Sequence, residues 1–200
     1  MERGYWIKSK PVYTSLSWHE KATSHLVVAQ GQGGLAVLKL FQQRQPKQPV
    51  TVLYVHQPDM ADDYANTLKK VVSEGLKVLG SEQEMMATLN SMMPTMHMGL
   101  RIYVAGSEGF IWSVAETAKK FSVEDVDIMK ELTGTLARSV YCVHCKAVTH
   151  NITTNIAKCS GCARNLFVRD HFSRHLGAYM GLMVDAESPG ELPEIEEIYP

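Results

Sequence analysis

The chain has 200 residues, a mass of 22.3 kDa, 45% hydrophobic and 20% charged residues, which is the composition of a folded protein with room for one medium domain and one small one. Twenty basic and twenty-one acidic side chains leave a net charge of −1, which argues against a general electrostatic grip on nucleic acid. The sequence has neither a run of eighteen apolar residues nor the apolar core of a signal peptide, so we expect a cytoplasmic protein without a membrane span.

The first predicted element is a strand over residues 25–30, which ends in glycines and leads into a helical pattern. Gly31, Gly33 and Ala36 match the spacing of the dinucleotide-binding fingerprint, with Gly34 beside them. Glycines at such a turn let a phosphate approach the backbone at the start of a helix. The acidic residue expected about 20 positions later is missing from the end of the next strand. We therefore expect a weak or degenerate nucleotide site.

Strands and helices alternate through the next hundred residues. Ser81 and Glu84 have the spacing of a capping box, and the helix that follows them carries an apolar face that includes Met85, Leu89 and Met93. A second glycine turn, at Gly106, follows the fourth strand. This order predicts a parallel sheet covered by helices, with any ligand crevice at the carboxyl ends of its strands. The later strands are predicted at residues 50–55, 76–79, 100–105 and 126–129.

All four cysteines lie in one short stretch: Cys142 and Cys145, then thirteen residues with room for a short hairpin, then Cys159 and Cys162. Each two-residue spacing aims two thiolates at one point, so the pattern predicts a tetrahedral four-sulfur metal site. Zinc is the expected metal, and a rubredoxin-type iron with the same ligands remains open. The alternative of two disulfides does not suit a cytosolic chain. A closed four-sulfur site has no open position for substrate, and we predict no catalytic residue.

Two histidines lie among these cysteines. His144 stands inside the first cysteine pair, and His150 stands in the segment between the pairs. Because four cysteines complete a tetrahedral site, we expect neither histidine to be a ligand.

Two stretches resemble the NAD(P)-binding domain of the ferredoxin reductase family. One is the strand and glycine turn at residues 26–34, and the other is residues 103–110. In the second stretch Ala105 replaces the family's cysteine and Ser107 its proline. The resemblance covers residues 24–132 and implies a reductase-like fold. It also implies NADPH as the ligand of the glycine turns, and the departures argue against a working site.

The stretch from Cys159 to Pro189 is similar to the zinc-ribbon end of the small subunit of bacterial dimethylamine monooxygenases, also described as haem-dependent oxidative N-demethylases. That similarity spans nearly the whole chain. It implies an accessory subunit of a complex that oxidises dimethylamine to methylamine and formaldehyde with NADPH and O2. The implied partners are a haem subunit, a reductase subunit with flavin and an iron–sulfur cluster, and a folate-binding subunit. Those cofactors are expected in the partners only.

The resulting domain prediction is an N-terminal extension (1–24), a reductase-like α/β domain (25–137), a zinc ribbon (138–187) and an acidic tail (188–200). The ribbon holds six basic and three acidic side chains, a net of +3, and the tail holds four glutamates, a net of −4. Phe167, Phe172 and Tyr179 are interleaved with the basic residues, which favours a docking face for a partner subunit. The alternative is a solvated ribbon with the acidic tail folded over it.

Two other functions remain open at this point. One is a stand-alone NAD(P)H redox protein with a rubredoxin-like iron centre. The other is a zinc-ribbon module that binds nucleic acid. A ribbon with a net charge of only +3 beside an acidic tail is poorly equipped for that role.

Overall fold

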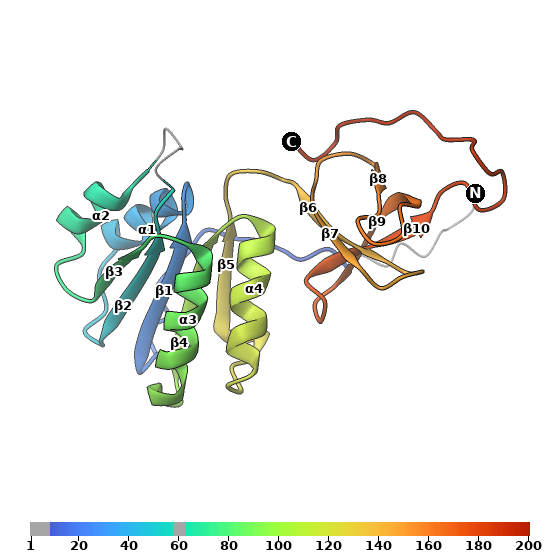
Figure 1. Ribbon diagram of the computed structural model, residues 1–200. Helices are drawn as coiled ribbons and strands as arrows, with labels where there is room; N and C mark the ends of the chain where they lie inside the picture. Colours follow the sequence, from blue (N-terminus) through green and yellow to red (C-terminus); the bar gives the residue numbers. More distant parts are fainter. Residues whose placement is uncertain (1–8, 58–62) are drawn as a thin grey trace, which may run out of the picture. The chain divides into compact units, whose positions relative to one another are not determined.

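The computed structural model describes residues 9–57 and 63–200. Residues 13–134 form one compact unit, the sheet unit, and residues 135–200 with the start of the chain form a second, the ribbon unit. The predicted fold class is confirmed, because a parallel α/β sheet is followed by a small sheet that carries the four-cysteine cluster (Figure 1). None of the helices in the described residues is long and apolar enough to cross a membrane.

The sheet unit is built on five parallel strands in the order β3-β2-β1-β4-β5. The chain starts in the middle of the sheet, winds to one edge, and returns to wind to the other. Its direction therefore reverses between β1 and β4, and the carboxyl ends of these strands mark the usual ligand position of such sheets. The strands are β1 (Ser24–Gln30), β2 (Val50–Val55), β3 (Leu76–Leu79), β4 (Leu100–Gly106) and β5 (Ile128–Leu132).

Helices cover both faces of this sheet (Figure 1). Val27 packs in the core cluster beneath α1 and α2, while its neighbours Leu26 and Val28 are equally buried. Burial on both faces is the reason why the strand reads as a continuous apolar run. Helix α1 packs against α2, and α3 packs against α4. The helices are α1 (Gly33–Gln42), α2 (Ala65–Val71), α3 (Glu82–Met92) and α4 (Glu108–Lys119).

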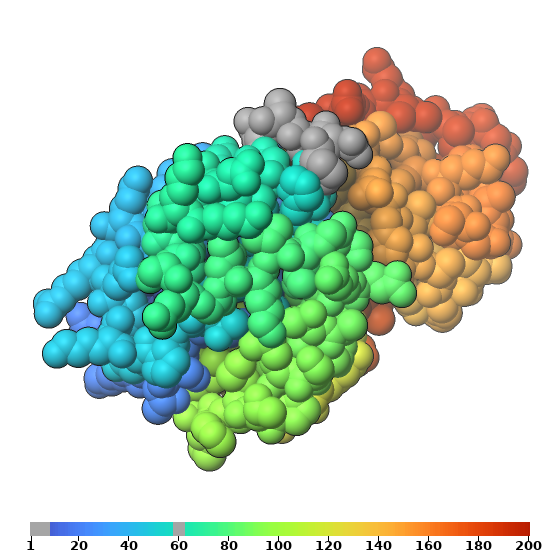
Figure 2. Space-filling view, turned by 60° about the vertical axis from the view of Figure 1, so that its left-hand side comes forward, coloured from blue at the N-terminus to red at the C-terminus, as the bar shows by residue number. Residues whose placement is uncertain are grey.

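The Ser81 half of the capping box predicted at residues 81–84 is present at the start of α3, where the Ser81 hydroxyl accepts a hydrogen bond from the Glu84 N–H at 3.1 Å. The Glu84 carboxylate accepts its bond from the Gly80 N–H at 2.8 Å, one residue before the N-cap that the motif uses. Met85 and Leu89 are buried on the inner face of the helix, as expected. The outer surface of residues 82–98, in green, faces the viewer in Figure 2.

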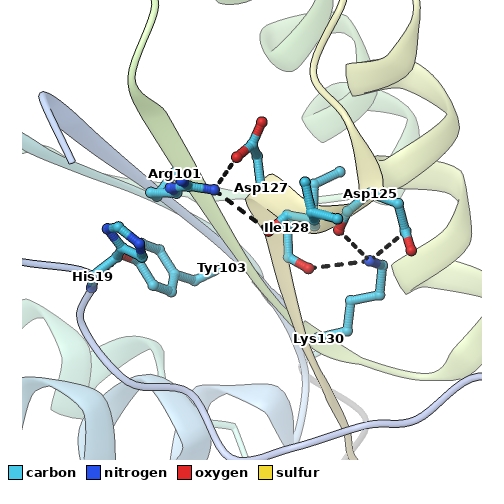
Figure 3. A network of polar contacts seen from close by, with 8 residues as sticks. His19, Arg101, Tyr103, Asp125, Asp127, Ile128 and Lys130 are labelled. Carbon is cyan, nitrogen blue, oxygen red and sulfur yellow. Dashed lines mark hydrogen bonds and ion pairs between the residues drawn. The ribbon is translucent and has the colours of Figure 1, made fainter. Parts of the chain in front are cut away.

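The last strand of the sheet begins later than predicted. β5 runs from Ile128 to Leu132, and Val126 lies in the preceding 3-10 turn (Asp125–Asp127) with its side chain 82% exposed. Ion pairs hold the start of the strand (Figure 3). Arg101 pairs with Asp127, and the buried Lys130 ammonium pairs with the Asp125 carboxylate at 2.6 Å. The polar pattern of this turn is the reason why the apolar residue inside it does not extend the strand.

A buried histidine lies where β1 begins. His25 is 2% exposed, its Nδ1 is 2.9 Å from the Tyr103 hydroxyl, and its ring meets Trp18 edge-on at 5.1 Å. The same hydroxyl accepts a hydrogen bond from the backbone N–H of His19 at 3.0 Å. Burial, which disfavours the charged imidazolium, lowers the pKa of His25 below its ordinary value.

This burial makes the sheet unit sensitive to acid. Below pH ~6.5 the unfolded chain takes up a proton at His25 that the folded chain takes up only at lower pH, so stability falls as the pH falls, by up to ~1.4 kcal/mol per pH unit. We expect His25→Gln to flatten this slope in urea unfolding between pH ~7.5 and ~5.5, followed by the fluorescence of Trp18. The exposed His97→Gln is the control. An unchanged slope in the His25 variant would contradict the assignment.

The ribbon unit is a mixed sheet in the order β7-β6-β10-β9-β8. β6 and β10 are parallel, and the other neighbours are antiparallel. Its core holds Val140, Leu166 and Val168 together with an edge-to-face aromatic pair, Phe172 and Tyr179, whose ring centroids are 4.9 Å apart. The strands are β6 (Arg138–Cys142), β7 (Val148–Ile152), β8 (Ile156–Lys158), β9 (Asn165–Ser173) and β10 (Ala178–Met183).

Two expectations about the ribbon are wrong. The segment between the cysteine pairs supplies β7 and β8, but these strands do not form a hairpin, because they lie at opposite edges of the sheet. Residues 153–155 alone join the two edges, so the sheet must curl toward a barrel. The predicted docking face is also incorrect in its aromatic part. Phe172 and Tyr179 are each 4% exposed and belong to the core, while Phe167 is 45% exposed.

Candidate metal centre and the glycine turns

The four cysteines of the ribbon unit meet at one point. Their sulfur atoms all lie within 4.8 Å of one another, and all four thiols are free. The Cys142 and Cys162 sulfurs are 3.8 Å apart, and those of Cys145 and Cys159 are 3.5 Å apart. Tetrahedral zinc with Zn–S bonds of ~2.3 Å requires sulfur–sulfur distances of ~3.8 Å, whereas a disulfide requires ~2.05 Å. The geometry therefore suits a tetrahedral metal ion and excludes the disulfide alternative.

The two cysteine pairs are presented by equivalent turns. In the first turn the Cys142 carbonyl accepts a hydrogen bond from the Lys146 N–H at 2.9 Å, and the Cys142 N–H donates to the Ala147 carbonyl. The second turn repeats both bonds, from Ala163 to Cys159 and from Cys159 to Arg164. Lys146 and Ala163 have the positive φ angles (69° and 58°) that close each turn. The repeat explains why a two-residue spacing in both pairs aims all four sulfurs inward.

Positive groups face the sulfurs on the second turn. The backbone N–H of Arg164, followed by its guanidinium and by His144, lowers the pKa of Cys162 to about 5. That sulfur is therefore a thiolate at neutral pH, which is the form that binds metal. His144 itself is exposed and its Nδ1 is 2.6 Å from the Arg164 guanidinium, and His150 contacts the Ser139 hydroxyl instead. His144 thus lies beside the Cys162 sulfur without being one of the four clustered sulfur ligands, whereas His150 is engaged elsewhere.

Gly161 is a residue of this site that spacing alone does not identify. A Cβ atom on Gly161 would lie 2.7 Å from the Ala147 Cβ and 3.0 Å from the Cys145 sulfur. Its N–H also donates to the Cys159 sulfur at 3.4 Å. The glycine thus lets the two turns approach closely enough for the sulfurs to share one ion.

We expect Gly161→Ala to weaken metal binding by ~10-fold or more, because the added methyl group pushes the two cysteine turns apart. Competition with a chromophoric chelator measures the affinity directly. Gly80→Ala is the matched control, because the nearest atom to its new Cβ is 3.6 Å away. Equal metal affinity in both variants would show that the close approach at Gly161 is not needed.

In the sheet unit, the glycines predicted to bind nucleotide lie together at the carboxyl ends of β1 and β4, and the chain's own atoms surround each of them. A Cβ on Gly31 (φ +49°) would lie 2.1 Å from the Gln57 amide oxygen, and one on Gly34 would lie 2.5 Å from the Tyr64 Cβ. A Cβ on Gly33 would lie 2.3 Å from the backbone carbonyl oxygen of Ala105, and one on Gly106 would lie 2.8 Å from the ring of Phe110. These glycines serve close packing.

Amide groups at this turn also have partners within the chain. The Gly34 N–H donates to the Gly31 carbonyl at 2.9 Å, and the Leu35 N–H donates to the Gln32 carbonyl at 3.1 Å. A dinucleotide phosphate uses amides of this kind at the start of the helix. Their internal bonds leave them poorly placed for an anion.

A tyrosine and a carboxylate close the turn from the side of β2. The buried Tyr54 hydroxyl lies 3.0 Å from the Gly31 carbonyl and 3.1 Å from the Asp63 carboxylate, and it accepts the Tyr64 N–H. Burial raises the pKa of Tyr54 to about 12, so the hydroxyl stays protonated. Burial alone would raise the pKa of Asp63, but the bonds to His56 and Tyr54 outweigh it and lower that pKa. The resulting anion repels a phosphate at this place.

A hollow of about 260 Å³ lies beside the turn. Residues at the start of α1 and within it line the hollow together with Tyr64 and Glu131. It is smaller than the ~300–1,000 Å³ of ordinary ligand pockets, and the Glu131 carboxylate already accepts the Leu16 N–H at 2.8 Å. The hollow is small and the glycine turn is filled by the chain's own atoms, so the described residues do not fit a bound dinucleotide.

Comparison with known proteins gives matches to both units. The family model described as "Dimethylamine monooxygenase subunit DmmA-like, N-terminal domain" matches residues 5–128, and its C-terminal counterpart matches residues 139–182. The "Heme-dependent oxidative N-demethylase delta subunit" of Ectopseudomonas mendocina (strain ymp) is 27% identical over 183 residues, which cover 90% of this chain and 91% of that one.

Two solved structures are similar to part of this chain at low identity. A type IV self-sufficient cytochrome P450 monooxygenase is 14% identical with a TM-score of 0.46, and the match covers 66% of this chain and 19% of that one. The ferredoxin reductase of a carbazole 1,9a-dioxygenase is 16% identical with a TM-score of 0.42, covering 59% and 40%. The family assignment rests on the sequence matches to both units: the chain belongs to the DmmA-like family of dimethylamine monooxygenase subunits.

Proposed function

We propose that this chain is a non-catalytic subunit of a dimethylamine monooxygenase complex, acting in assembly or in docking for electron transfer. The complex would oxidise dimethylamine to methylamine and formaldehyde with NADPH and O2. The observation that carries the proposal is the match of both units to one subunit family, together with a named delta subunit whose length it shares. A subunit name in such a relative implies further subunits.

The non-catalytic role is supported by the two sites that could have carried chemistry. Four sulfurs complete the coordination of a tetrahedral ion and keep no position for substrate. The glycine turns are packed against Gln57, Tyr64 and the backbone of β4. The haem, the flavin with an iron–sulfur cluster and the folate therefore belong, in this proposal, to partner subunits.

We propose zinc as the ion, held by Cys142, Cys145, Cys159 and Cys162. The sulfur spacing of 3.5–3.8 Å suits Zn–S bonds, and a closed four-sulfur zinc site stabilises a small fold. Elemental analysis of the purified chain should find one zinc per chain and no visible colour. A red protein with one iron would instead support a rubredoxin-like electron-transfer role.

Co-purification from the native host tests the subunit role. We expect the chain to elute with the haem, reductase and folate subunits, and the isolated chain to show no NADPH binding by calorimetry. Tight NADPH binding by the isolated chain, or elution apart from every other subunit, would contradict the proposal. Retention of nucleic acid at physiological salt would favour the ribbon as a nucleic-acid module instead.

A further inference from the structure

The end of the chain is fastened to the ribbon unit along its backbone. Residues 194–200, called the C-terminal strap, run beside residues 153–155, which join the two edges of the curled sheet. The Thr153 carbonyl accepts hydrogen bonds from Ile198 and Tyr199 at 2.9 and 2.8 Å, and Asn155 bonds through both its backbone and its side chain to residues 194 and 196. The Leu136 N–H donates to Pro200 at 2.6 Å. The strap therefore has a fixed course.

An aromatic anchor fixes the last turn of the strap. Tyr199 is 9% exposed, and the centre of its ring lies 3.7 Å from the Arg138 guanidinium carbon. The same guanidinium carbon lies 3.9 Å from the centre of the Tyr179 ring. Arg138 also pairs with the Asp170 carboxylate at 2.9 Å. The strap thus contributes one side chain to a cation–aromatic cluster of the ribbon core.

The other apolar side chains near the strap point to solvent. Leu192, Ile195 and Ile198 are 43%, 57% and 43% exposed. Four glutamates (Glu191, Glu194, Glu196 and Glu197) alternate with them along the sequence, and residues 188–200 contain no lysine or arginine; these glutamates are called the acidic rim. Isolated exposed aliphatic residues are ordinary, but Ile195 and Ile198 lie on the anchored strap and Leu192 lies two residues before it, and these three are called the apolar ridge.

The anchoring gives this ridge an advantage as a binding surface. Fixing a residue costs conformational free energy, and a mobile tail would lose that free energy only when it binds its partner. Here the hydrogen bonds of Thr153 and Asn155 and the stacking of Tyr199 fix the backbone beforehand. Preorganisation of this kind strengthens association without adding contacts.

We propose that the ridge formed by Leu192, Ile195 and Ile198 docks into an apolar groove, rimmed by lysine and arginine, on another subunit of the complex. This proposal rests on the proposed function and names the surface that would serve it. Charge selects the occupant: four glutamates repel the phosphates of nucleic acid and the anionic headgroups of membranes, and they complement a basic protein surface.

The test measures binding of the full-length, metal-loaded chain to a complex of the haem, reductase and folate subunits that lacks it. Ile195→Ser/Ile198→Ser should weaken binding by at least ~10-fold, since both substitutions remove apolar area that binding would bury. Val126→Ser/Met98→Ser is the control, because those side chains are 82% and 96% exposed on the sheet unit. Unchanged metal content and circular dichroism show that every variant folds.

Charge reversal tests the acidic rim separately. Glu194→Lys/Glu197→Lys should weaken binding and remove its dependence on salt, whereas Glu74→Lys/Glu116→Lys, at exposed positions of the sheet unit, should not. If the wild-type chain binds and the ridge variants bind equally well, the ridge proposal is wrong while the subunit role stands. If the wild-type chain binds none of the subunits, both are wrong. A third outcome is that the ridge variants bind the subunits normally but lose self-association or binding to anionic vesicles. That result would show that the ridge binds a different partner, and it would overturn the proposal.

Discussion

Replacing Cys142 by serine is expected to unfold the ribbon unit while the sheet unit stays folded. A serine hydroxyl is a poor ligand for a soft site, so the tetrahedral set loses one of its four thiolates. Structural zinc binding contributes an apparent ~10–16 kcal/mol to small domains of this type. The ribbon unit buries few large side chains of its own and cannot replace such a contribution. Cys159→Ser, in the other turn, should have the same effect.

Limited proteolysis with mass analysis measures this result. The variants should be cleaved within residues 135–200 and leave a resistant fragment that ends near residue 134, where the two units divide. Chelation of the wild-type chain should give the same fragment, and His175→Ala, at an exposed position of the ribbon unit outside the two cysteine turns, should not. A ribbon unit that resists protease after loss of Cys142 would mean that the sheet alone holds it together. In that case the metal would need another role.

The parts of the fold that the sequence predicts well are those in which neighbours along the chain decide the outcome. The apolar run at residues 26–29 is buried whichever strands flank it, and the cysteine spacing fixes each turn within five residues. The placement of β7 and β8 depends instead on partners far along the chain. β7 pairs with β6, β8 pairs with β9, and the parallel pairing of β6 with β10 separates them. The sequence of the thirteen-residue segment does not indicate those distant partners. A hairpin within the segment is therefore the simplest structure to expect from the sequence alone.

The candidate functional residues also divide into those that local sequence predicts and those that depend on distant partners. The four metal ligands could be predicted because their chemistry and spacing are local. The side chains that fill the glycine turn could not, since Gln57 and Tyr64 reach it from the segment after β2, and glutamine and tyrosine carry no signature of such contacts. Tyr199 was hidden for a similar reason: its partner Arg138 lies sixty residues earlier, in the strand that leads to the first cysteine. Composition showed an acidic tail, but only the backbone bonds to residues 153–155 show that it is anchored.

Gly33→Ala is expected to destabilise the sheet unit by ~2–4 kcal/mol. The new Cβ would lie 2.3 Å from the Ala105 carbonyl oxygen and 2.6 Å from its carbon. These are backbone atoms of β4, an inner strand of the sheet, which cannot move aside as a flexible side chain can, so α1 must shift away from the sheet. Gly80→Ala, with no atom closer than 3.6 Å, is the control for the conformational effect of removing a glycine.

This variant also separates the two explanations for the glycine turn. If the glycine serves packing, urea unfolding shows the loss of stability with or without NADPH, because no nucleotide contact is removed. If the glycine serves a pyrophosphate, NADPH stabilises the wild-type chain against urea, and the variant loses that protection. Three observations favour the packing explanation over the nucleotide explanation. The Gln57 side chain lies against Gly31, the Asp63 carboxylate lies beside Tyr54, and the amides of the turn bond within the chain. A turn that keeps the glycines of a nucleotide site only to bring α1 against β4 suits a subunit that contributes its surface to a complex.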